Sequence, residues 1–347
     1  MRPTTSVMRS EIAEQPAALR RTLADLLPRT PEIAQLGRRT RHVLFIARGS
    51  SDNAAVYGSY LVQAHCGRLT SLASPSVATT YGAELDLSGV LAVAISQSGR
   101  TEEIVETTRW AAGCGARTVA ITNGAGSPLT RDADLALVTR AGDEVAVPAT
   151  KTYTTQLAAL AVLALGLGAD LDQGELTAVP DTLETHLESP DERITDMAER
   201  LVDVHGAVVS GRGLAFSTAL ETALKLKEAC YLRAMGLSYA DLLHGPIAVV
   251  DRSTPAILVA ADSGPTLPGT VALAERVTAA GAASYGIGGG PRLREACDLA
   301  VPAPDLPEWL APVGLAVPAQ ILTEQLSRLL GYDPDSPRGL GKVTQTS

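Results

Sequence analysis

Three hydroxyl groups and one amide side chain fall within the six-residue segment 96–101. The segment is Ser96-Gln97-Ser98-Gly99-Arg100-Thr101, and it follows the apolar run Leu91 to Ile95. From Thr101 onward the pattern predicts a helix with two acidic residues in its first turn. The first backbone N–H groups of a helix have no partner within it, so together with side-chain donors they can bind phosphate. The segment therefore predicts a phosphate site, although an ordinary helix N-cap would use the same residue types.

A second group of residues could perform acid–base chemistry. Glu221, Lys225 and Glu228 lie at positions i, i+4 and i+7 of a predicted helix over 219–228, and hence on one face. Such a face is often only a solvated surface laced with ion pairs. His244 follows in a Leu/Gly/Pro loop, and an imidazole is a plausible proton donor or acceptor near neutral pH. Beside a phosphate loop, these residues indicate proton transfer on a phosphorylated compound.

The chain repeats itself, which bears on the elements that must position these residues. Several short segments recur at an offset of 164 residues, among them Gln156 and Gln320. The phosphate segment itself is matched by Ser263-Gly264-Pro265-Thr266 at an offset of 165, as a one-residue insertion would produce. A constant offset of this kind predicts two homologous domains.

Short apolar runs alternate with longer amphipathic ones in both halves, a pattern that predicts parallel sheets covered by helices on both faces. The expected strands are 42–47, 69–73, 91–95, 118–121 and 135–138, then 207–211, 255–260, 283–287 and 299–301. The fold class is thus α/β, with two flavodoxin-like domains. Ligands of such sheets bind beyond the carboxyl ends of the strands, where Gly49-Ser50-Ser51 and 96–101 both fall.

The domain boundaries follow from changes in pattern along the chain. We expect a helical segment over 1–40 that packs on the first domain, which covers 41–168. An acidic, Pro-containing linker over 169–192 leads to the second domain over 193–330. A polar segment over 331–347 follows as a tail.

Composition limits the class of protein. With 46% hydrophobic and 19% charged residues among 347, the chain can bury two cores. Its longest apolar helix, Leu157 to Leu167, is shorter than the ~20 residues needed to cross a bilayer, and no signal peptide pattern begins the chain. We therefore expect a cytoplasmic protein with no membrane partner.

Net charge and cysteine spacing exclude further classes. A net charge of −9, with two Phe and two Trp, argues against a nucleic-acid partner. The four cysteines show no C-x-x-C spacing, so neither a disulfide framework nor a metal site is expected. No cofactor is predicted.

Five separated motifs carry a resemblance to a known family. They are Ser96-Gln97-Ser98-Gly99-x-Thr101, Thr150-Lys151-x-x-Thr154-Thr155-Gln156, Ala223-Leu224-Lys225-Leu226-Lys227-Glu228, His244-Gly245-Pro246 and Pro337-Arg338-x-Leu340-x-Lys342. In order and spacing they resemble the isomerase half of glucosamine-6-phosphate synthase, which belongs to the double sugar-isomerase (SIS) family. The resemblance covers essentially the whole chain, and nothing in the sequence resembles the glutaminase half.

The resemblance implies roles for individual residues. It makes Glu228 the base that moves a proton between C1 and C2, with Lys225 positioning it. His244 would open the sugar ring. The tail over 331–347 would close over the active site, where Lys342 would engage the sugar carbonyl. The residues implied to hold the phosphate or sugar are Gly49, Ser51, Ser96, Gln97, Ser98, Thr101 and Thr150. The His244 loop would come from a neighbouring subunit, so a homodimer with shared sites is expected.

Departures from the synthase pattern affect the expected substrate. Arg100 replaces a Glu, Ala149 replaces a Ser that contacts the sugar, and Leu243 replaces a Lys. These changes leave the implied phosphate-binding and proton-transfer residues in place but alter the contacts to the sugar hydroxyls.

The resemblance also suggests a reaction. Without a glutaminase to deliver ammonia, the same chemistry most naturally runs toward ammonia release, from an aminosugar phosphate such as glucosamine 6-phosphate to fructose 6-phosphate. Three alternatives stay open: an ammonia-dependent synthase-like isomerase, a fructosamine-6-phosphate deglycase, and a sugar-phosphate sensor without catalysis. Intact Glu228, His244 and Lys342 argue against the sensor, because binding requires none of them.

Overall fold

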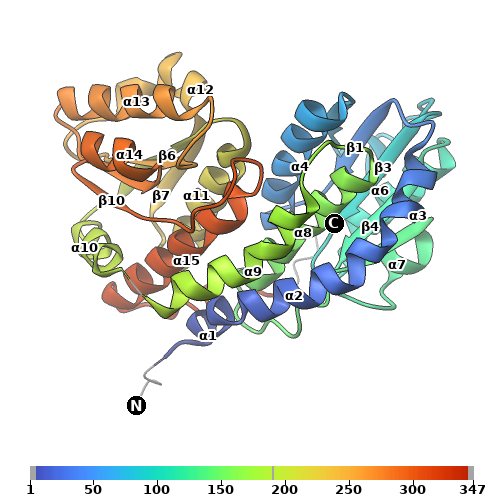
Figure 1. Cartoon of the computed structure of the whole chain (residues 1–347), viewed down its shortest axis with the longest axis horizontal. Helices are drawn as coiled ribbons and strands as arrows, with labels where there is room; N and C mark the ends of the chain where they lie inside the picture. The colour runs from blue at the N-terminus through green and yellow to red at the C-terminus, as the bar shows by residue number, and fades with distance from the viewer. Residues whose placement is uncertain (1–4, 190, 343–347) are drawn as a thin grey trace. The chain divides into compact units, whose positions relative to one another are not determined.

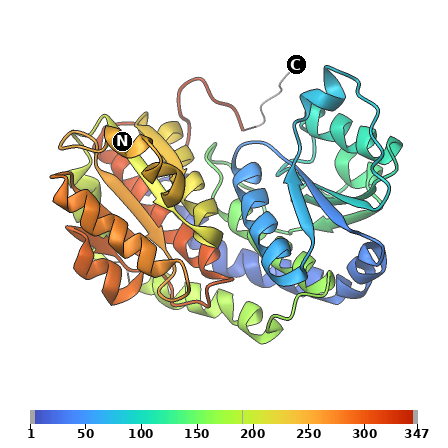
Figure 2. The same cartoon turned by 90° about the horizontal axis from the view of Figure 1, so that it is seen from above.

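The structure is a computed structural model that describes residues 5–189 and 191–342. It divides into two compact units. The first-sheet unit comprises Ala17–Glu144, Lys151–Thr177 and the chain from Gly341 on. The second-sheet unit comprises the chain up to Pro16, Val145–Thr150 and Ala178–Leu340. Each unit contains a five-stranded sheet with helices on both faces (Figures 1 and 2).

The first-sheet unit has an all-parallel sheet with the strand order β2-β1-β3-β4-β5. Its strands are β1 (His42–Ile46), β2 (Leu69–Leu72), β3 (Val90–Ile95), β4 (Arg117–Thr122) and β5 (Leu135–Val138). This is the flavodoxin-like order, in which the direction of strand progression reverses between β1 and β3. The predicted fold class is confirmed for this unit, and its ligand-binding edge is expected where β1 and β3 end.

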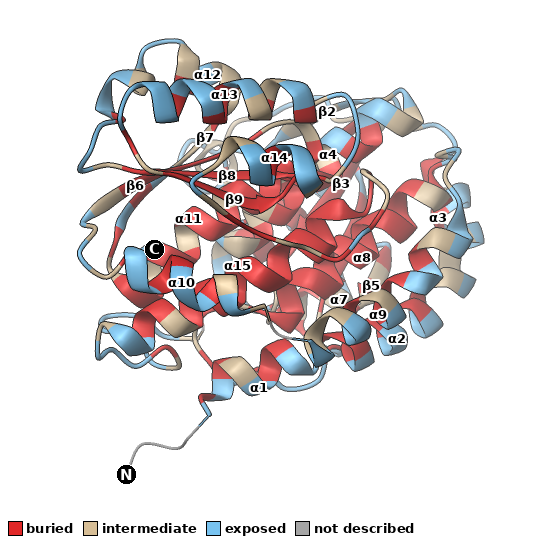
Figure 3. Cartoon of the chain, turned by 60° about the vertical axis from the view of Figure 1, so that its left-hand side comes forward, coloured by how far each residue is buried: buried red, intermediate tan, exposed pale blue. Residues whose placement is uncertain are grey.

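Two layers of helices cover this sheet. The helices are α2 (Gln15–Leu26), α3 (Thr30–Gly37), α4 (Ser50–Cys66), α5 (Ser76–Thr79), α6 (Glu102–Gly113), α7 (Pro128–Asp132) and α8 (Lys151–Gly166), with a 3₁₀ turn η1 (Leu27–Arg29). On one face α4 approaches closely at Gly58, where a Cβ atom would lie 2.8 Å from Leu160 and 3.1 Å from the Phe45 ring. The other face buries apolar residues of α6 and α7, among them Ile104 and Leu129. Helix α8 is buried along nearly its whole length (Figure 3).

The second-sheet unit has the strand order β10-β9-β8-β6-β7, again entirely parallel. Its strands are β6 (Gly206–Gly211), β7 (Arg233–Ser238), β8 (Ala256–Ala260), β9 (Ser284–Gly288) and β10 (Leu299–Val301). Numbered within this unit, the order is the same as in the first, which confirms the predicted duplication. Strand β7 was not predicted from the sequence.

Helices also cover both faces of the second sheet. They are α10 (Glu192–Arg200), α11 (Phe216–Cys230), α12 (Tyr239–Leu243), α13 (Leu267–Ala279), α14 (Gly290–Ala296) and α15 (Ala311–Leu329), with 3₁₀ turns η2 (Gly213–Ala215) and η3 (Pro246–Val249). Helices α12, α13 and α14 contribute to one hydrophobic cluster with the strands, centred on Val208, Leu258 and Leu273. Helices α10, α11 and α15 pack together on the other face. A further helix, α9 (Gln173–Glu188), occupies most of the predicted linker 169–192.

We expected the N-terminal segment to pack on the first domain, but part of it belongs to the second-sheet unit. Helix α1 (Val7–Ala13) lies in the second-sheet unit, where the Ser6 hydroxyl donates to Glu324 Oε1 at 2.7 Å. Gln15 Nε2 likewise donates to Gln320 Oε1 at 3.0 Å. Buried polar partners on α15 therefore fix α1, and the expectation holds only from Ala17 onward.

The structure describes the tail up to Lys342. The Asp335 carboxylate accepts hydrogen bonds from the backbone N–H groups of Val7 and Met8, at 2.8 and 2.7 Å. A carboxylate is favourable there because the start of a helix carries partial positive charge. Further along, the Arg338 guanidinium lies 4.2 Å from the centre of the Tyr231 ring. Both contacts lie within the second-sheet unit and hold the tail up to Leu340.

Candidate functional site

The predicted phosphate segment forms a tight turn between β3 and α6. The Ser96 hydroxyl accepts from the Gly99 N–H at 3.2 Å, and the Ser98 hydroxyl accepts from the Arg100 N–H at 3.2 Å. Gly99 has φ +63°, and a Cβ atom there would lie 2.2 Å from the Ser127 hydroxyl oxygen. Only glycine fits this position, so the turn depends on it.

Thr101 stands at the N-cap of α6 but does not cap it with its side chain. Its hydroxyl lies 3.5 Å from the Ser96 hydroxyl. An ordinary N-cap Thr would accept from an N–H group of the first helical turn. The structure therefore disfavours the simple capping interpretation and leaves this hydroxyl at a helix N-terminus, where an anion is stabilised.

The turn after β1 lies at the same edge of the sheet. β1 pairs in parallel with β3, so the carboxyl ends of the two strands are neighbours. Gly49 is the N-cap of α4 with φ +58°, and the buried hydroxyl of Ser51 accepts from Gln156 Nε2 at 3.0 Å. The predicted residues Gly49, Ser51, Ser96, Gln97, Ser98 and Thr101 thus come together at the point where the strand order reverses.

Charges at this edge are partly compensated. The Arg48 guanidinium makes two hydrogen bonds to the Glu103 carboxylate, at 3.0 and 3.1 Å, and so joins the Gly49 turn to the first turn of α6. Burial raises the pKa of the Asp52 carboxyl, and the nearby positive charge of Arg48 offsets part of that shift. An anion bound here would favour the protonated form of Asp52 further, because like charges repel.

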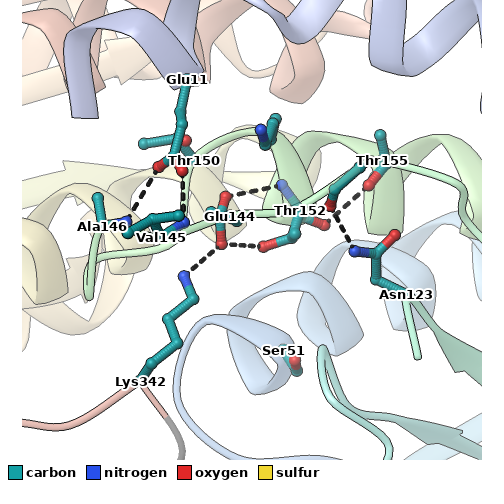
Figure 4. A network of polar contacts seen from close by, with 12 residues as sticks. Glu11, Ser51, Asn123, Glu144, Val145, Ala146, Thr150, Thr152, Thr155 and Lys342 are labelled. Atoms are coloured by element: carbon teal, nitrogen blue, oxygen red, sulfur yellow. Dashed lines mark hydrogen bonds and ion pairs between the residues drawn. The ribbon is translucent and has the colours of Figure 1, made fainter. Parts of the chain in front are cut away.

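Lys342 belongs to the first-sheet unit and contacts Glu144 (Figure 4). Its Nζ lies 2.6 Å from Glu144 Oε2, and the Glu144 side chain is 0% exposed against 24% for Lys342. Glu144 also accepts from the Thr152 hydroxyl at 2.6 Å and from the Thr152 N–H at 3.1 Å. The carboxylate therefore holds both the start of α8 and the tail lysine.

Thr150, predicted to bind the sugar, is fully buried in the second-sheet unit. Its carbonyl oxygen accepts from Gln320 Nε2 at 3.3 Å. Earlier in the same segment, the Glu11 carboxylate accepts from the backbone N–H groups of Val145 and Ala146 (Figure 4). These contacts fix the backbone of 145–150, so Thr150 has a structural role in this segment whatever else it binds.

The predicted acidic face of α11 is buried. Lys225 Nζ forms ion pairs with Glu228 Oε2 and, at 3.5 Å, with Glu221 Oε1. The Lys225 and Glu221 side chains are each 3% exposed, whereas Glu228 is 23% exposed. The interpretation of this face as solvated surface is therefore wrong. Burying such a charge cluster costs desolvation free energy, which favours a functional reason for its presence. Glu228 is the most exposed of the three side chains, and so the one that a ligand can reach.

His244 follows α12 in the second-sheet unit and is exposed. Its backbone N–H donates to the Asp241 carbonyl at 3.1 Å. Among the described residues, no hydrogen bond or ion pair joins its imidazole to Glu228. The predicted site residues thus fall into two groups: the phosphate-loop residues with Lys342 in the first-sheet unit, and Thr150, Lys225, Glu228 and His244 in the second.

Sequence reasoning missed two side chains that contact the predicted residues. Glu144 pairs with a lysine 198 positions away, and Gln156, noted in the repeat and in a family motif but given no role, donates to Ser51 across 105 positions. No local pattern reports such distances. The one available signal was that Gln156 is a polar residue inside an otherwise apolar helix.

The potential metal ligands and two of the cysteine thiols in the described part of the chain bear on metal and thiol chemistry. Within residues 5–189 and 191–342, no group of three or more His, Cys, Asp or Glu side chains is placed to hold a metal ion. Burial raises the pKa of Cys230 and of Cys297 to about 12, so both thiols stay protonated at neutral pH. In the same residues, no helix is both long and apolar enough to span a membrane.

Comparison with known proteins identifies the family of this chain. Residues 38–166 match the model of the SIS domain. A proposed phosphosugar isomerase from Silicibacter pomeroyi, of known crystal structure, is 32% identical with a TM-score of 0.85. The alignment covers 95% of this chain and 100% of that one. The chain belongs to the SIS-domain family.

Two further SIS-domain comparisons bear on function. The glutamine–fructose-6-phosphate aminotransferase (isomerizing) of Pyrococcus horikoshii is 36% identical over 96% of this chain. The chain spans 57% of the length of that relative. A crystal structure of glucosamine-6-phosphate deaminase from Thermotoga maritima is 25% identical with a TM-score of 0.80, covering 98% of this chain and 100% of that chain. The resemblance found in the sequence is thereby confirmed at the level of the family.

Proposed function

We propose that the chain is a sugar-phosphate isomerase that acts on an aminosugar phosphate such as glucosamine 6-phosphate and releases ammonia and fructose 6-phosphate. One observation carries this proposal: Glu228 is held by the buried Lys225 and still partly exposed. A carboxylate fixed in this way suits a proton carrier, whereas simple binding of a sugar phosphate needs none. The names of the relatives from P. horikoshii and T. maritima support an aminosugar phosphate as the substrate class.

The first-sheet residues would hold the phosphate. Backbone N–H groups at the start of α6, together with the hydroxyls of Ser98 and Thr101, offer donors to phosphate oxygens. Ser51, held by Gln156, adds another hydroxyl from the neighbouring turn. The substrate would be anchored by its phosphate while the chemistry takes place at C1 and C2.

The reaction then requires two proton movements and one water. His244 would assist opening of the ring to the free aldehyde. Glu228 would take the proton from C2, leaving an enolamine, and return it to C1 to give an imine at C2. Water adds to C2, ammonia leaves, and the ketose phosphate remains. Lys342 would interact with the sugar carbonyl, as charge or as a covalent imine.

The exposed position of His244 favours one further element of the proposal. A loop histidine with access to solvent can reach the site of a second copy of the chain, as the family resemblance implies. We therefore include a homodimer with shared sites. Sedimentation equilibrium would show it, and a monomer that retains full activity would contradict this element alone.

The decisive experiment measures products from a panel of phosphorylated sugars. Purified protein is incubated with glucosamine 6-phosphate, its epimers and fructosamine 6-phosphate, and ammonia and ketose phosphate are quantified together. We expect both products in equal amounts from an aminosugar phosphate. Amine release from fructosamine 6-phosphate alone would indicate a deglycase, and formation of aminosugar only when ammonia is supplied with fructose 6-phosphate would indicate the synthase direction.

A further inference from the structure

Lys342, the last residue described, contacts a buried carboxylate. The Glu144 side chain is 0% exposed and accepts hydrogen bonds from Thr152 and from Lys342. Lys342 is the only one of these donors with a formal charge, and both residues belong to the first-sheet unit. The ion pair therefore places a positive charge beside the buried Glu144 carboxylate.

The carboxylate itself is rigidly placed (Figure 4). Its two oxygens bind the backbone and the hydroxyl of Thr152, in the first turn of α8, a helix that is buried along nearly its whole length. In the next positions of the chain, Val145 and Ala146 donate to Glu11 within the second-sheet unit. Glu144 thus has contacts to Thr152 that do not involve Lys342, whereas the lysine has a long side chain with several rotatable bonds.

We propose that Glu144 is the docking residue for the tail and controls whether the Lys342 amine is available to a bound sugar. The role of the Lys342 amine in this inference rests on the proposed function, whereas the ion pair between Glu144 and Lys342 does not. Glu144 is a positioning residue in this scheme, because it acts through Lys342 and not on the substrate.

The docked pair also accounts for the protons of an imine at Lys342. The ammonium cannot attack a carbonyl until it loses a proton, and Glu144 Oε2 lies 2.6 Å away as the acceptor. The neutral amine adds to the carbonyl carbon, and the protonated Glu144 returns its proton to the departing hydroxyl. One water is released and the imine carries the positive charge, so atoms and charge balance without any added reagent.

Four variants separate docking from chemistry. Glu144→Gln keeps the size and one acceptor oxygen for the Thr152 N–H, but replaces the charged oxygen that accepts from Lys342. Lys342→Arg keeps a cation for Glu144 but lacks an amine that can add to a carbonyl. Thr152→Val removes one hydroxyl donor and leaves the ion pair. Glu32→Gln is the matched control, because Glu32 is a carboxylate of the same unit that pairs with Arg29 at the surface.

The first readout is tail docking, measured by trypsin cleavage after residues 338 and 342 in the full-length protein. We expect Glu144→Gln to be cut at least ~10-fold faster than the parent, Lys342→Arg and Glu32→Gln to be cut at the parental rate after residue 338, and Thr152→Val to lie between. Equal rates in Glu144→Gln and the control would overturn the proposal.

The second readout is the amine itself, trapped with cyanoborohydride and fructose 6-phosphate and located by peptide mass spectrometry. We expect Glu144→Gln to lower kcat and the trapping rate together by ~10-fold or more, with KM changed little because the phosphate loop is untouched. Unchanged kcat and trapping in Glu144→Gln would overturn the control of Lys342 by Glu144. Faster tail cleavage in Glu144→Gln, in a protein that turns over no sugar phosphate, would contradict the proposed function and still support the docking.

Discussion

The two sheets have the same strand order, but the loops that follow their third strands differ in what they hold. In the first-sheet unit, the loop of Ser96 to Thr101 presents a hydroxyl at the start of α6 that takes no part in capping. In the second-sheet unit, the matching loop, Ser263 to Thr266, is occupied by a carboxylate of the chain itself. A Cβ atom on Gly264 would lie 2.6 Å from the Glu308 carboxyl carbon, and Glu308 hydrogen-bonds to Thr266.

The residue that occupies the second loop has its own counterpart. Glu308 lies 164 positions after Glu144, the offset that relates Gln320 to Gln156. One carboxylate of the pair docks a lysine, and the other fills a loop that in the first unit is proposed to bind phosphate. After duplication, equivalent positions were thus used for different partners, and we expect one external anion site per chain.

The largest effect is expected at Glu228, which has no acidic counterpart in the first unit. Position 64, at the same offset, is Ala. Glu228→Gln should lower turnover by more than ~10² while sugar-phosphate binding stays nearly unchanged, because it removes the proton carrier and keeps the side chain's size. Solvent deuterium exchange at C2 and substrate titration measure the two quantities. Exchange that continues at the parental rate in the variant would rule out Glu228 as the base.

The second prediction compares the two loops directly. Ser98→Ala with Thr101→Ala should raise KM at least ~10-fold, because each hydrogen bond to a charged group contributes ~1.5–3 kcal/mol. Ser263→Ala with Thr266→Ala is the matched pair in the second loop, and its KM should equal that of the parent. Titration with phosphorylated and unphosphorylated sugar tests both. Equal losses of affinity in the two pairs would show that both loops bind substrate, and a loss of melting temperature alone would restore the capping interpretation.

The third prediction concerns the paired glutamines. Gln320→Leu removes an acceptor of the Gln15 amide and a donor to the Thr150 carbonyl, so the free energy of unfolding should fall by ~1–3 kcal/mol. Gln156→Leu removes the donor to Ser51 and should raise KM several-fold with a smaller loss of stability. Chemical denaturation and steady-state kinetics separate the effects. The comparison fails if the glutamines exchange roles, with KM affected by Gln320→Leu and only stability by Gln156→Leu.

The smallest effect is expected from Glu308, through pH. Burial raises the pKa of Glu308 above its ordinary 4.5, more than the Thr266 hydrogen bond lowers it. Its protonated form is therefore favoured in the folded state, and that contribution is lost as pH rises through the folded pKa. Glu308→Gln should match the parent below about pH 4 and melt about 1 °C higher at neutral pH. A variant that is less stable than the parent at neutral pH would show that the ionised carboxylate is favoured in the loop.

Much of the fold could be predicted, because buried parallel strands are continuous apolar runs. β1, β3 and β10 agree with the predicted ranges to within one residue at each end. β7 was missed because Arg233, Gly236 and Ser238 interrupt its apolar pattern. It is also an edge strand that pairs only with β6, so its other edge has no neighbouring strand and a continuous apolar run is not required.

The site was predictable only where its residues are neighbours in sequence. Residues 96–101 form one turn, so their types and order were sufficient. The spacing of Lys225 and Glu228 showed that they share a face of a helix, but burial of that face depends on α15 and β7, which lie elsewhere in the sequence. Glu144 and Lys342 are joined only by the folded chain. Residues 343–347 of the predicted tail lie outside the described residues.

The position of α1 has a consequence for synthesis of the chain. Residues up to Pro16 belong with Ala178–Leu340, while 17–144 and 151–177 form most of the other unit, so one domain is inserted between two pieces of its neighbour. A ribosome delivers the inserted domain nearly complete by residue 177, and domains generally fold as units during translation. The contacts of α1 with α15 and Asp335, including that of Gln15 with Gln320, can form only after those residues have been made. The Glu144–Lys342 ion pair forms later still, because Lys342 follows Asp335 in the chain.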